Sequence, residues 1–193
     1  TWKVLEACRR LNFKGGIIIA SSDKAYGAHK NLPYTEKTPL QGSNPYDASK
    51  SCADLIAQSY ASTYKLKVVI TRCGNIYGPG DFNFSRIIPD ALRCVINKKT
   101  LLVRSNGKFT RDYIYVDDIV KGYIAIAERI RKSGLGGEAF NFSNEDPLSV
   151  KSLLGKINYV SGKKLKYRIL NKAQFEIPHQ YLSSKKARNK LGW

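Results

Sequence analysis

The order of two very apolar segments constrains the fold of this chain more than any other sequence feature. The segments 17–20 and 66–72 are short apolar runs, and a helical pattern over residues 45–64 lies between them. Runs as apolar as these are typical of strands that are covered on both faces, and a strand–helix–strand order places two strands side by side in parallel. The sequence therefore predicts an α/β fold, with a parallel sheet and helices on both faces.

The predicted helix between the two strands has clear start signals. Asn44 is the expected N-cap, Pro45 stands at the first helical position, and Asp47 adds negative charge to the first turn. Its predicted buried face follows the helical period and consists of Ala48, Cys52, Leu55, Ile56, Ser59 and Tyr60.

Helical and strand patterns continue along the rest of the chain. Further helices are predicted at about residues 1–12, 89–97, 117–131, 149–162 and 183–193, and further strands at 100–105, 139–143 and 165–169. The first helix has no start signal, and the sequence contains no methionine. We therefore expect this sequence to be the later part of a longer protein.

The formal net charge of +18 is the most conspicuous bulk property of the 193 residues. Such a charge is consistent with binding of nucleic acid or of a polyanionic small substrate, or it is only a basic surface without a specific partner. The lysine runs do not alternate with aromatic residues that could stack on bases. A nucleic-acid-binding module is therefore the minority hypothesis.

No segment indicates export, membrane insertion or metal binding. No apolar run approaches the roughly 20 residues of a membrane span, and no signal peptide is visible. The four cysteines form no CxxC pair and share no metal-ligand spacing with either histidine. These features predict a cytoplasmic protein with reduced thiols and no metal site.

Tyr46 and Lys50 are the first candidates for chemistry. They lie four residues apart at the start of the predicted helix, so both side chains emerge on one face. A nearby ammonium group and the N-terminus of a helix both stabilise a phenolate, which suits a general base acting on a hydroxyl. Ser22 follows the first predicted strand, and the carboxyl ends of parallel strands face one crevice. We expect these three side chains to converge on one substrate atom, although Ser22–Lys24 taken alone also fits a solvated turn.

Five segments together resemble one enzyme family. They are SSDKAYG, NPYDASK, RCGNIYGPGD, RDYIYVDD and KKARNKLGW. In this order they are similar to the extended short-chain dehydrogenase/reductase family, whose members are NAD-dependent nucleotide-sugar epimerases and dehydratases, over nearly the whole chain. The resemblance implies the C-terminal part of a Rossmann-type sheet and a smaller α/β substrate-binding domain.

The resemblance also implies a division into domains. Residues 1–78 would form a partial NAD-binding domain, because the family's glycine-rich loop has no counterpart in this sequence. Residues 79–193 would form the substrate-binding domain, with about 112–130 returning to pack on the first domain. A homodimer is implied through the opening helix and the 45–64 helix, where Ala53, Ala57 and Ala61 would allow close approach.

Ser22, Tyr46 and Lys50 match the catalytic triad of the family. The resemblance implies that Tyr46 takes the proton of the sugar 4-hydroxyl while hydride passes to NAD. Lys50 would support the tyrosine and hold the nicotinamide ribose, and Ser22 would bond the reacting oxygen. Asp23 and Lys24 follow as in CDP-glucose 4,6-dehydratases and some UDP-N-acetylglucosamine dehydratases. In that role Asp23 protonates the leaving C6 hydroxyl, and Lys24 takes the C5 proton.

Further matches concern binding. The resemblance implies that NAD is contacted by Tyr46, Lys50, Cys73 and Ile76. It implies that the nucleotide-diphosphate sugar is contacted by Asn75, Arg86, Arg111 and Asn141. The planar fork of an arginine suits a diphosphate, and the alternative for the two arginines is a surface ion pair with Asp90 or Asp112.

The leading prediction is thus an NAD-dependent 4,6-dehydratase acting on CDP-glucose or a similar NDP-hexose. A 4-epimerase or decarboxylase of the same family is the alternative, with Asp23 and Lys24 serving the structure only. The nucleic-acid-binding module rests on the net charge alone.

Overall fold

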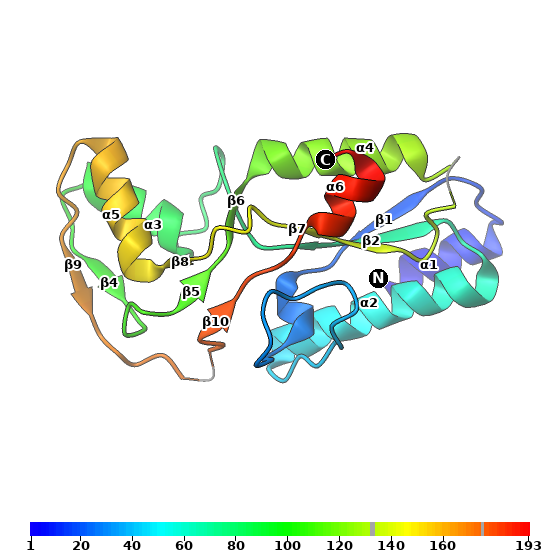
Figure 1. The fold of residues 1–193 in the computed structure, drawn as a ribbon, viewed down its shortest axis with the longest axis horizontal. Coiled ribbons are helices and arrows are strands. Elements are labelled where there is room, and N and C mark those ends of the chain that lie inside the picture. Colours follow the sequence, from blue (N-terminus) through cyan, green and yellow to red (C-terminus); the bar gives the residue numbers. More distant parts are fainter. Residues whose placement is uncertain (132–133, 175) are drawn as a thin grey trace.

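A three-stranded parallel sheet forms the centre of the larger part of the molecule (Figure 1). The structure is a computed structural model that describes residues 1–131, 134–174 and 176–193. The strands run in the order β1 (Ile17–Ala20), β2 (Val68–Cys73) and β7 (Ala139–Phe142). The predicted parallel sheet is confirmed, and its third strand comes from a distant segment of the chain.

Helices cover both faces of this sheet, as the sequence predicts (Figure 1). On one face lie α1 (Trp2–Arg10) and α2 (Pro45–Tyr64). On the other face lie α4 (Val116–Arg129) and α6 (Lys185–Leu191). A short sheet with both faces covered explains why its strands are almost continuously apolar.

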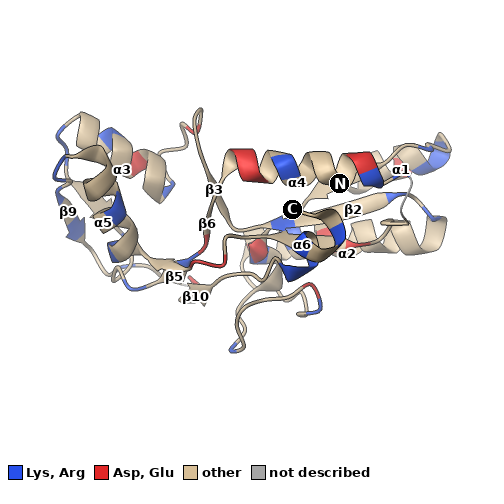
Figure 2. Ribbon diagram, turned by 45° about the horizontal axis from the view of Figure 1, so that its top comes forward, with Lys and Arg blue, Asp and Glu red and all other residues tan. Residues whose placement is uncertain are grey.

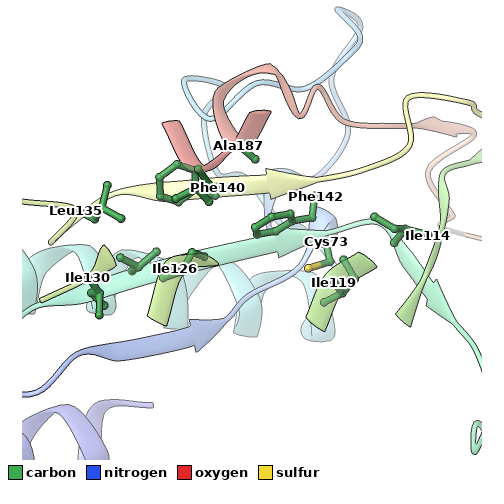
Figure 3. Packing of buried hydrophobic residues seen from close by; sticks show 11 residues of the cluster. Cys73, Ile114, Ile119, Ile126, Ile130, Leu135, Phe140, Phe142 and Ala187 are labelled. Atoms are coloured by element: carbon green, nitrogen blue, oxygen red, sulfur yellow. The ribbon is translucent and has the colours of Figure 1, made fainter. Parts of the chain in front are cut away.

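Strand β2 is buried along its whole length. Its side chains point alternately into the hydrophobic cores on the two faces of the sheet. Val68 and Ile70 pack in the cluster with α1 and α2. Val69 and Cys73 belong to the cluster under α4 and α6, which Figure 3 shows from close by. The alternation follows from the period of two in a strand, and it joins both helical layers through one strand.

The buried face of α2 differs from the predicted one. Its buried residues are Asp47, Ser51, Asp54, Ala57 and Ala61. Leu55 is 52% exposed, and Cys52 is exposed as well. Ile56 and Tyr60 of the predicted face do pack against the core beside the sheet. Asp54 is buried in place of Leu55 because its carboxylate accepts two hydrogen bonds from Arg72 on β2. Buried polar groups follow their partners and not the apolar period.

A smaller part lies beyond the sheet, at the left of Figure 1. It contains α3 (Ile87–Ile96), β4 (Leu101–Val103), α5 (Val150–Ser161) and β9 (Tyr167–Ile169), and β4 pairs in parallel with β9. Its separate core is formed by residues that include Ala91, Leu101, Leu154 and Leu165. The predicted helix at 149–162 is confirmed as α5, with Ser149 as its N-cap and Gly162 as its C-cap.

Short strands connect the two parts. β3 (Asn75–Tyr77) pairs with β6 (Tyr113–Tyr115). β5 (Thr110–Arg111) lies between β8 (Leu148–Ser149) and β10 (His179–Gln180). The sequence analysis does not predict these five strands, each of which has only two or three residues.

The larger part gathers more of the chain than the sequence predicts. Residues 112–130 return to it through α4, and β7 and α6 return as well. Phe140, Phe142, Ala187 and Leu191 from these two elements enter the core beneath α4. The predicted division at residue 78 therefore has to be extended by β7 and α6.

Basic residues are distributed over both parts of the molecule. Lys and Arg occur on α3, α5 and β9 of the smaller part and on α4 and α6 of the larger part (Figure 2). Within the described ranges, no helix combines the length and the apolarity that crossing a membrane requires.

Candidate active site

A short 3-10 helix, η1 (Asp23–Tyr26), turns the chain directly after β1. Ser22 is its N-cap, and the Ser22 Oγ accepts a hydrogen bond from the backbone N–H of Lys24 at 3.2 Å. Gly27 follows with φ +69°, and a Cβ at this position would lie 2.3 Å from the carbonyl oxygen of Gln41. The polar residues after the strand therefore form one defined turn at the carboxyl end of the sheet.

A network of buried polar side chains anchors η1 to the sheet and to α2. The Tyr26 hydroxyl donates to Asn141 Oδ1 at 2.7 Å and accepts from Arg72 Nη1 at 2.9 Å. Arg72 also donates two hydrogen bonds of 2.8 Å to the Asp54 carboxylate, and all four residues are buried. Removing one partner of such a buried ion pair typically costs about 3–5 kcal/mol. The network therefore ties η1 firmly to β2, β7 and α2.

Asn141 belongs to this network. Its side chain is fully buried on β7, where Oδ1 accepts from Tyr26 and Nδ2 donates to the Tyr34 carbonyl at 3.1 Å. It does not line the cavity described next. The contact of Asn141 with the nucleotide sugar therefore stays a prediction, and the bonds that the structure gives to both ends of its amide lie inside the protein.

A cavity of about 720 Å³ opens between the carboxyl ends of the sheet strands and the smaller part. This volume is typical of small-molecule sites. The cavity brings together nine of the eleven predicted site residues: Ser22, Asp23, Lys24, Tyr46, Cys73, Asn75, Ile76, Arg86 and Arg111. Lys50, like Asn141, does not line it.

Tyr46 and Lys50 lie one turn apart at the start of α2, as predicted. Tyr46 lines the cavity and is 58% exposed, so its phenol is accessible to a ligand. The Lys50 Nζ lies 5.9 Å from the centroid of the Tyr46 ring and donates a 3.1 Å hydrogen bond to the Ala20 carbonyl. Lys50 is thus tied to the end of β1 beside the tyrosine.

Asp23 and Lys24 form an acid–base pair in the wall of the cavity. Asp23 is buried, and its Oδ1 accepts a hydrogen bond from Ser22 Oγ at 3.0 Å. Its Oδ2 has no hydrogen-bond partner within the described part of the chain and lies 3.6 Å from Lys24 Nζ. Burial lowers the pKa of Lys24; Asp23 opposes this shift, and Arg111 adds to it. A lysine with a lowered pKa loses its proton more readily and can then act as a base.

Gln180 is a neighbour of this pair that the sequence does not reveal. It is fully buried on β10, where its Oε1 accepts from Lys24 Nζ and its Nε2 donates to the Asp23 carbonyl at 2.8 Å. The contact with Lys24 spans 156 residues, and β10 is too short to show a pattern. No signal in the sequence could have paired the two residues.

Arg86 and Arg111 bring positive charge to the cavity, each beside an acidic side chain. Arg86 Nη1 lies 3.1 Å from Asp81 Oδ2, and Arg111 Nη2 lies 3.7 Å from Glu176 Oε2. Their acidic partners are therefore not the two aspartates that the sequence suggests. Because a guanidinium carries five N–H donors, both arginines retain donors for a phosphate group.

Cys73, Ile76 and Ser21 line the cavity beside the sheet. Burial raises the pKa of the Cys73 thiol to about 12, so the thiol is neutral near pH 7. The Ser21 Oγ is buried and has no hydrogen-bond partner among the described residues. This part of the wall can contact an apolar group of a ligand, and the Ser21 hydroxyl can form a hydrogen bond with a polar group beside it.

Comparison with protein families gives one matching family model. The model of the NAD dependent epimerase/dehydratase family matches residues 1–142.

Two curated relatives illustrate the sequence similarity. The dTDP-D-glucose 4,6-dehydratase of Dictyostelium discoideum is 36% identical over 162 residues, which cover 76% of this chain and 36% of the relative. The CDP-glucose 4,6-dehydratase of Salmonella typhimurium is 28% identical over 207 residues, covering 100% of this chain and 57% of the relative. The chain thus spans about half the length of the curated relatives it matches, or less.

Solved structures show the same fold. The dTDP-glucose 4,6-dehydratase of Streptomyces venezuelae, with NAD bound, has a TM-score of 0.90 at 27% identity and covers 100% of this chain and 58% of its own. The UDP-glucuronic acid 4-epimerase of Bacillus cereus, in complex with UDP-glucuronic acid and NAD, also has a TM-score of 0.90, at 23% identity, and covers 100% and 60%. The second likeness concerns the fold alone.

Proposed function

Because this chain belongs to the NAD dependent epimerase/dehydratase family, we propose that the protein is an NAD-dependent nucleotide-sugar 4,6-dehydratase. The observation that carries the proposal is the position of Asp23 and Lys24 in the cavity wall, beside Ser22 and Tyr46. A 4-epimerase only oxidises and re-reduces C4, whereas a dehydratase also needs an acid and a base for the elimination. Relatives named as 4,6-dehydratases support this choice.

In the proposed reaction, Tyr46 takes the proton of the sugar 4-hydroxyl while Ser22 bonds the same oxygen. NAD, when bound, would supply the hydride acceptor for C4 and the hydride donor for C6. Lys24 removes the C5 proton, which a ketone at C4 makes acidic, and the electron pair of that C–H bond forms the C5–C6 double bond. Asp23 gives a proton to the C6 hydroxyl, which leaves as water. Lys24 finally returns its proton to C5.

The described residues fit the nicotinamide half of NAD. Tyr46 and Lys50 would hold the nicotinamide ribose, and Cys73 and Ile76 would contact the ring. The unpaired Ser21 hydroxyl on the same wall offers a hydrogen bond to a polar group of the ring. On this proposal the larger part is a partial NAD-binding domain, and the smaller part binds the substrate.

The proposed substrate is CDP-glucose or a similar NDP-hexose. Arg86 and Arg111 would face the diphosphate, and Asn75 lines the same cavity. Charge-assisted bonds from the planar guanidinium group are well suited to phosphate oxygens. The Salmonella typhimurium relative named CDP-glucose 4,6-dehydratase aligns with the whole chain. We also place the protein in the cytoplasm, a compartment in which its four free cysteines stay reduced.

Product analysis tests this function. The protein that carries this sequence is incubated with NAD and, separately, with CDP-glucose, dTDP-glucose, UDP-glucose and UDP-N-acetylglucosamine. A 4-keto-6-deoxy sugar, one water lighter than its substrate by mass spectrometry, is the expected product. A C4 epimer of unchanged mass would instead identify the alternative activity within the family.

Replacing Arg111 by alanine is expected to raise KM for the nucleotide sugar about tenfold to a hundredfold while kcat changes little. The reason is that Arg111 would contact the diphosphate, which does not react. Lys121→Ala is the matched control, because it removes one positive charge from the exposed surface of α4. Steady-state kinetics of both variants make the comparison. An unchanged KM in Arg111→Ala would mean that Arg111 serves only its ion pair with Glu176.

We also propose that the protein forms a homodimer through α1 and α2. The two helices pack against each other and leave large apolar side chains exposed: Trp2 (54%), Val4 (59%) and Leu55 (52%). Ala57 and Ala61 do not take part, contrary to the sequence-based expectation, because both are buried against the sheet of their own chain.

Sedimentation is expected to give a dimer mass for the protein and a monomer mass for Leu55→Asp. A charge at this position would oppose burial in the interface and weaken association by at least about 2 kcal/mol. Val160→Asp is the control, because Val160 is 83% exposed on α5, in the smaller part. A wild-type protein that stays monomeric at every concentration would remove the dimer proposal.

A further inference from the structure

Gln180 contacts both residues of the acid–base pair described above. Its Oε1 accepts a hydrogen bond from Lys24 Nζ, and its Nε2 donates to the backbone carbonyl of Asp23 at 2.8 Å. We propose that Gln180 is a positioning residue that holds the amine of Lys24 at the cavity wall, in the orientation required for proton abstraction. The inference rests on the proposed function and adds a residue from the far end of the chain to its machinery.

The position of Gln180 is itself fixed by the fold. Strand β10 pairs in parallel with β5, and Gln180 stands in register with Arg111. The residue is fully buried, and both ends of its amide are bonded to the segment Asp23–Lys24. The backbone of η1, the Lys24 amine and the strand that carries Arg111 are therefore linked through one side chain.

Lys24 needs such a partner because its side chain is long. A lysine has four rotatable bonds, and an unrestrained amine would leave the reactive geometry most of the time. Misplacing a reacting group by about 1 Å can cost on the order of a hundredfold in rate. With one N–H bonded to a fixed acceptor, the Lys24 amine is held in the wall of the cavity.

The neutral amide of Gln180 is suited to this task. Lys24 is already faced by Asp23 on η1, by Asp47 on α2 and by Arg111 on β5. A third acid in contact with the amine would stabilise its protonated form and oppose its action as a base. An amide oxygen accepts an N–H bond from the ammonium and from the free amine alike, so it orients Lys24 without adding charge.

Two substitutions test the inference in the protein that carries this sequence. Gln180→Met keeps the length and volume of the side chain but removes both hydrogen bonds. Gln180→Glu keeps an acceptor for Lys24 but adds a negative charge. His179→Ala is the matched control, because this adjacent β10 residue bonds Thr110 Oγ1 at 2.9 Å and does not line the cavity.

Two readouts separate positioning from a structural role. Gln180→Met is expected to slow the elimination about tenfold to a hundredfold while oxidation at C4 changes less than about twofold. Gln180→Glu is expected to raise the pKa of Lys24, measured without NAD or substrate by trace acetylation with acetic anhydride across a pH series and peptide mass spectrometry. His179→Ala should leave both readouts at their wild-type values.

The inference is overturned if Gln180→Met slows both chemical steps equally, or if Gln180→Glu leaves the pKa of Lys24 unchanged. The acetylation measurement remains decisive if Gln180→Met does not fold. It also separates the two proposals. A wild-type protein that releases no dehydrated sugar would refute the proposed function, while the coupling between Gln180 and Lys24 would still be read from acetylation.

Discussion

Replacing Lys24 by alanine is expected to stop the loss of water while oxidation at C4 continues. Tyr46 and Lys50 lie on α2 and do not depend on Lys24 for the first step, whereas proton removal at C5 needs a base of its own. The variant should form reduced nicotinamide and a 4-keto sugar that keeps its C6 hydroxyl. In deuterated water it should place no deuterium at C5.

The experiment follows nicotinamide absorbance and C5 labelling in one reaction with the nucleotide sugar. Lys30→Ala is the control, because Lys30 is an exposed lysine six residues further along the chain. If Lys24→Ala still yields the full 4-keto-6-deoxy product, Lys24 is only a residue of the turn after β1. The protein would then be assigned to the epimerase side of its family.

Replacing Tyr46 by phenylalanine is expected to lower kcat by about a hundredfold or more, because the base for the 4-hydroxyl is lost. The change removes one oxygen from a side chain that is 58% exposed, so stability should hardly change. In contrast to Lys24→Ala, this variant should fail already at the oxidation of C4. Single-turnover measurement of nicotinamide absorbance shows which step is lost.

Tyr159→Phe provides the control for Tyr46→Phe, since Tyr159 is 89% exposed on α5 in the smaller part. It should keep wild-type kinetics. Turnover close to the wild-type value in Tyr46→Phe would be incompatible with the role given to this phenol. It would leave Ser22 and Lys24 as the groups to test for the first proton transfer.

The location of the proposed catalytic residues could be predicted because they lie in short continuous segments. Ser22, Asp23 and Lys24 follow one strand directly, and Tyr46 and Lys50 share one helix face through the helical period. The parallel arrangement of β1 and β2 then brings the segments to one edge of the sheet. The relative positions of residues that are close in sequence follow from the period of their helix or strand, so they can be predicted without knowledge of distant contacts.

Residues that meet across the fold could not be predicted in this way. Asn141 matches a ligand contact of the family. Its amide oxygen, however, accepts a hydrogen bond from Tyr26, which lies 115 residues earlier in the chain. On α2, Asp54 is buried because its carboxylate accepts hydrogen bonds from Arg72 of β2, while Leu55 of the apolar stripe is exposed. In both cases the partner of a polar group determines its orientation, and that partner is known only once the chain is folded.

The amino-acid sequence was therefore sufficient to predict the parallel sheet, the helices on its faces and the polar turn and helix start to which we assign the chemistry. Apolar periods and the polar turn after a strand are local properties, so they are readable without coordinates. Three contacts became known only from the folded chain: Arg111 faces Glu176, Asn141 supports η1, and Gln180 reaches Lys24. Each of these depends on hydrogen bonds or charges between segments far apart in the chain, whose geometry no local pattern contains.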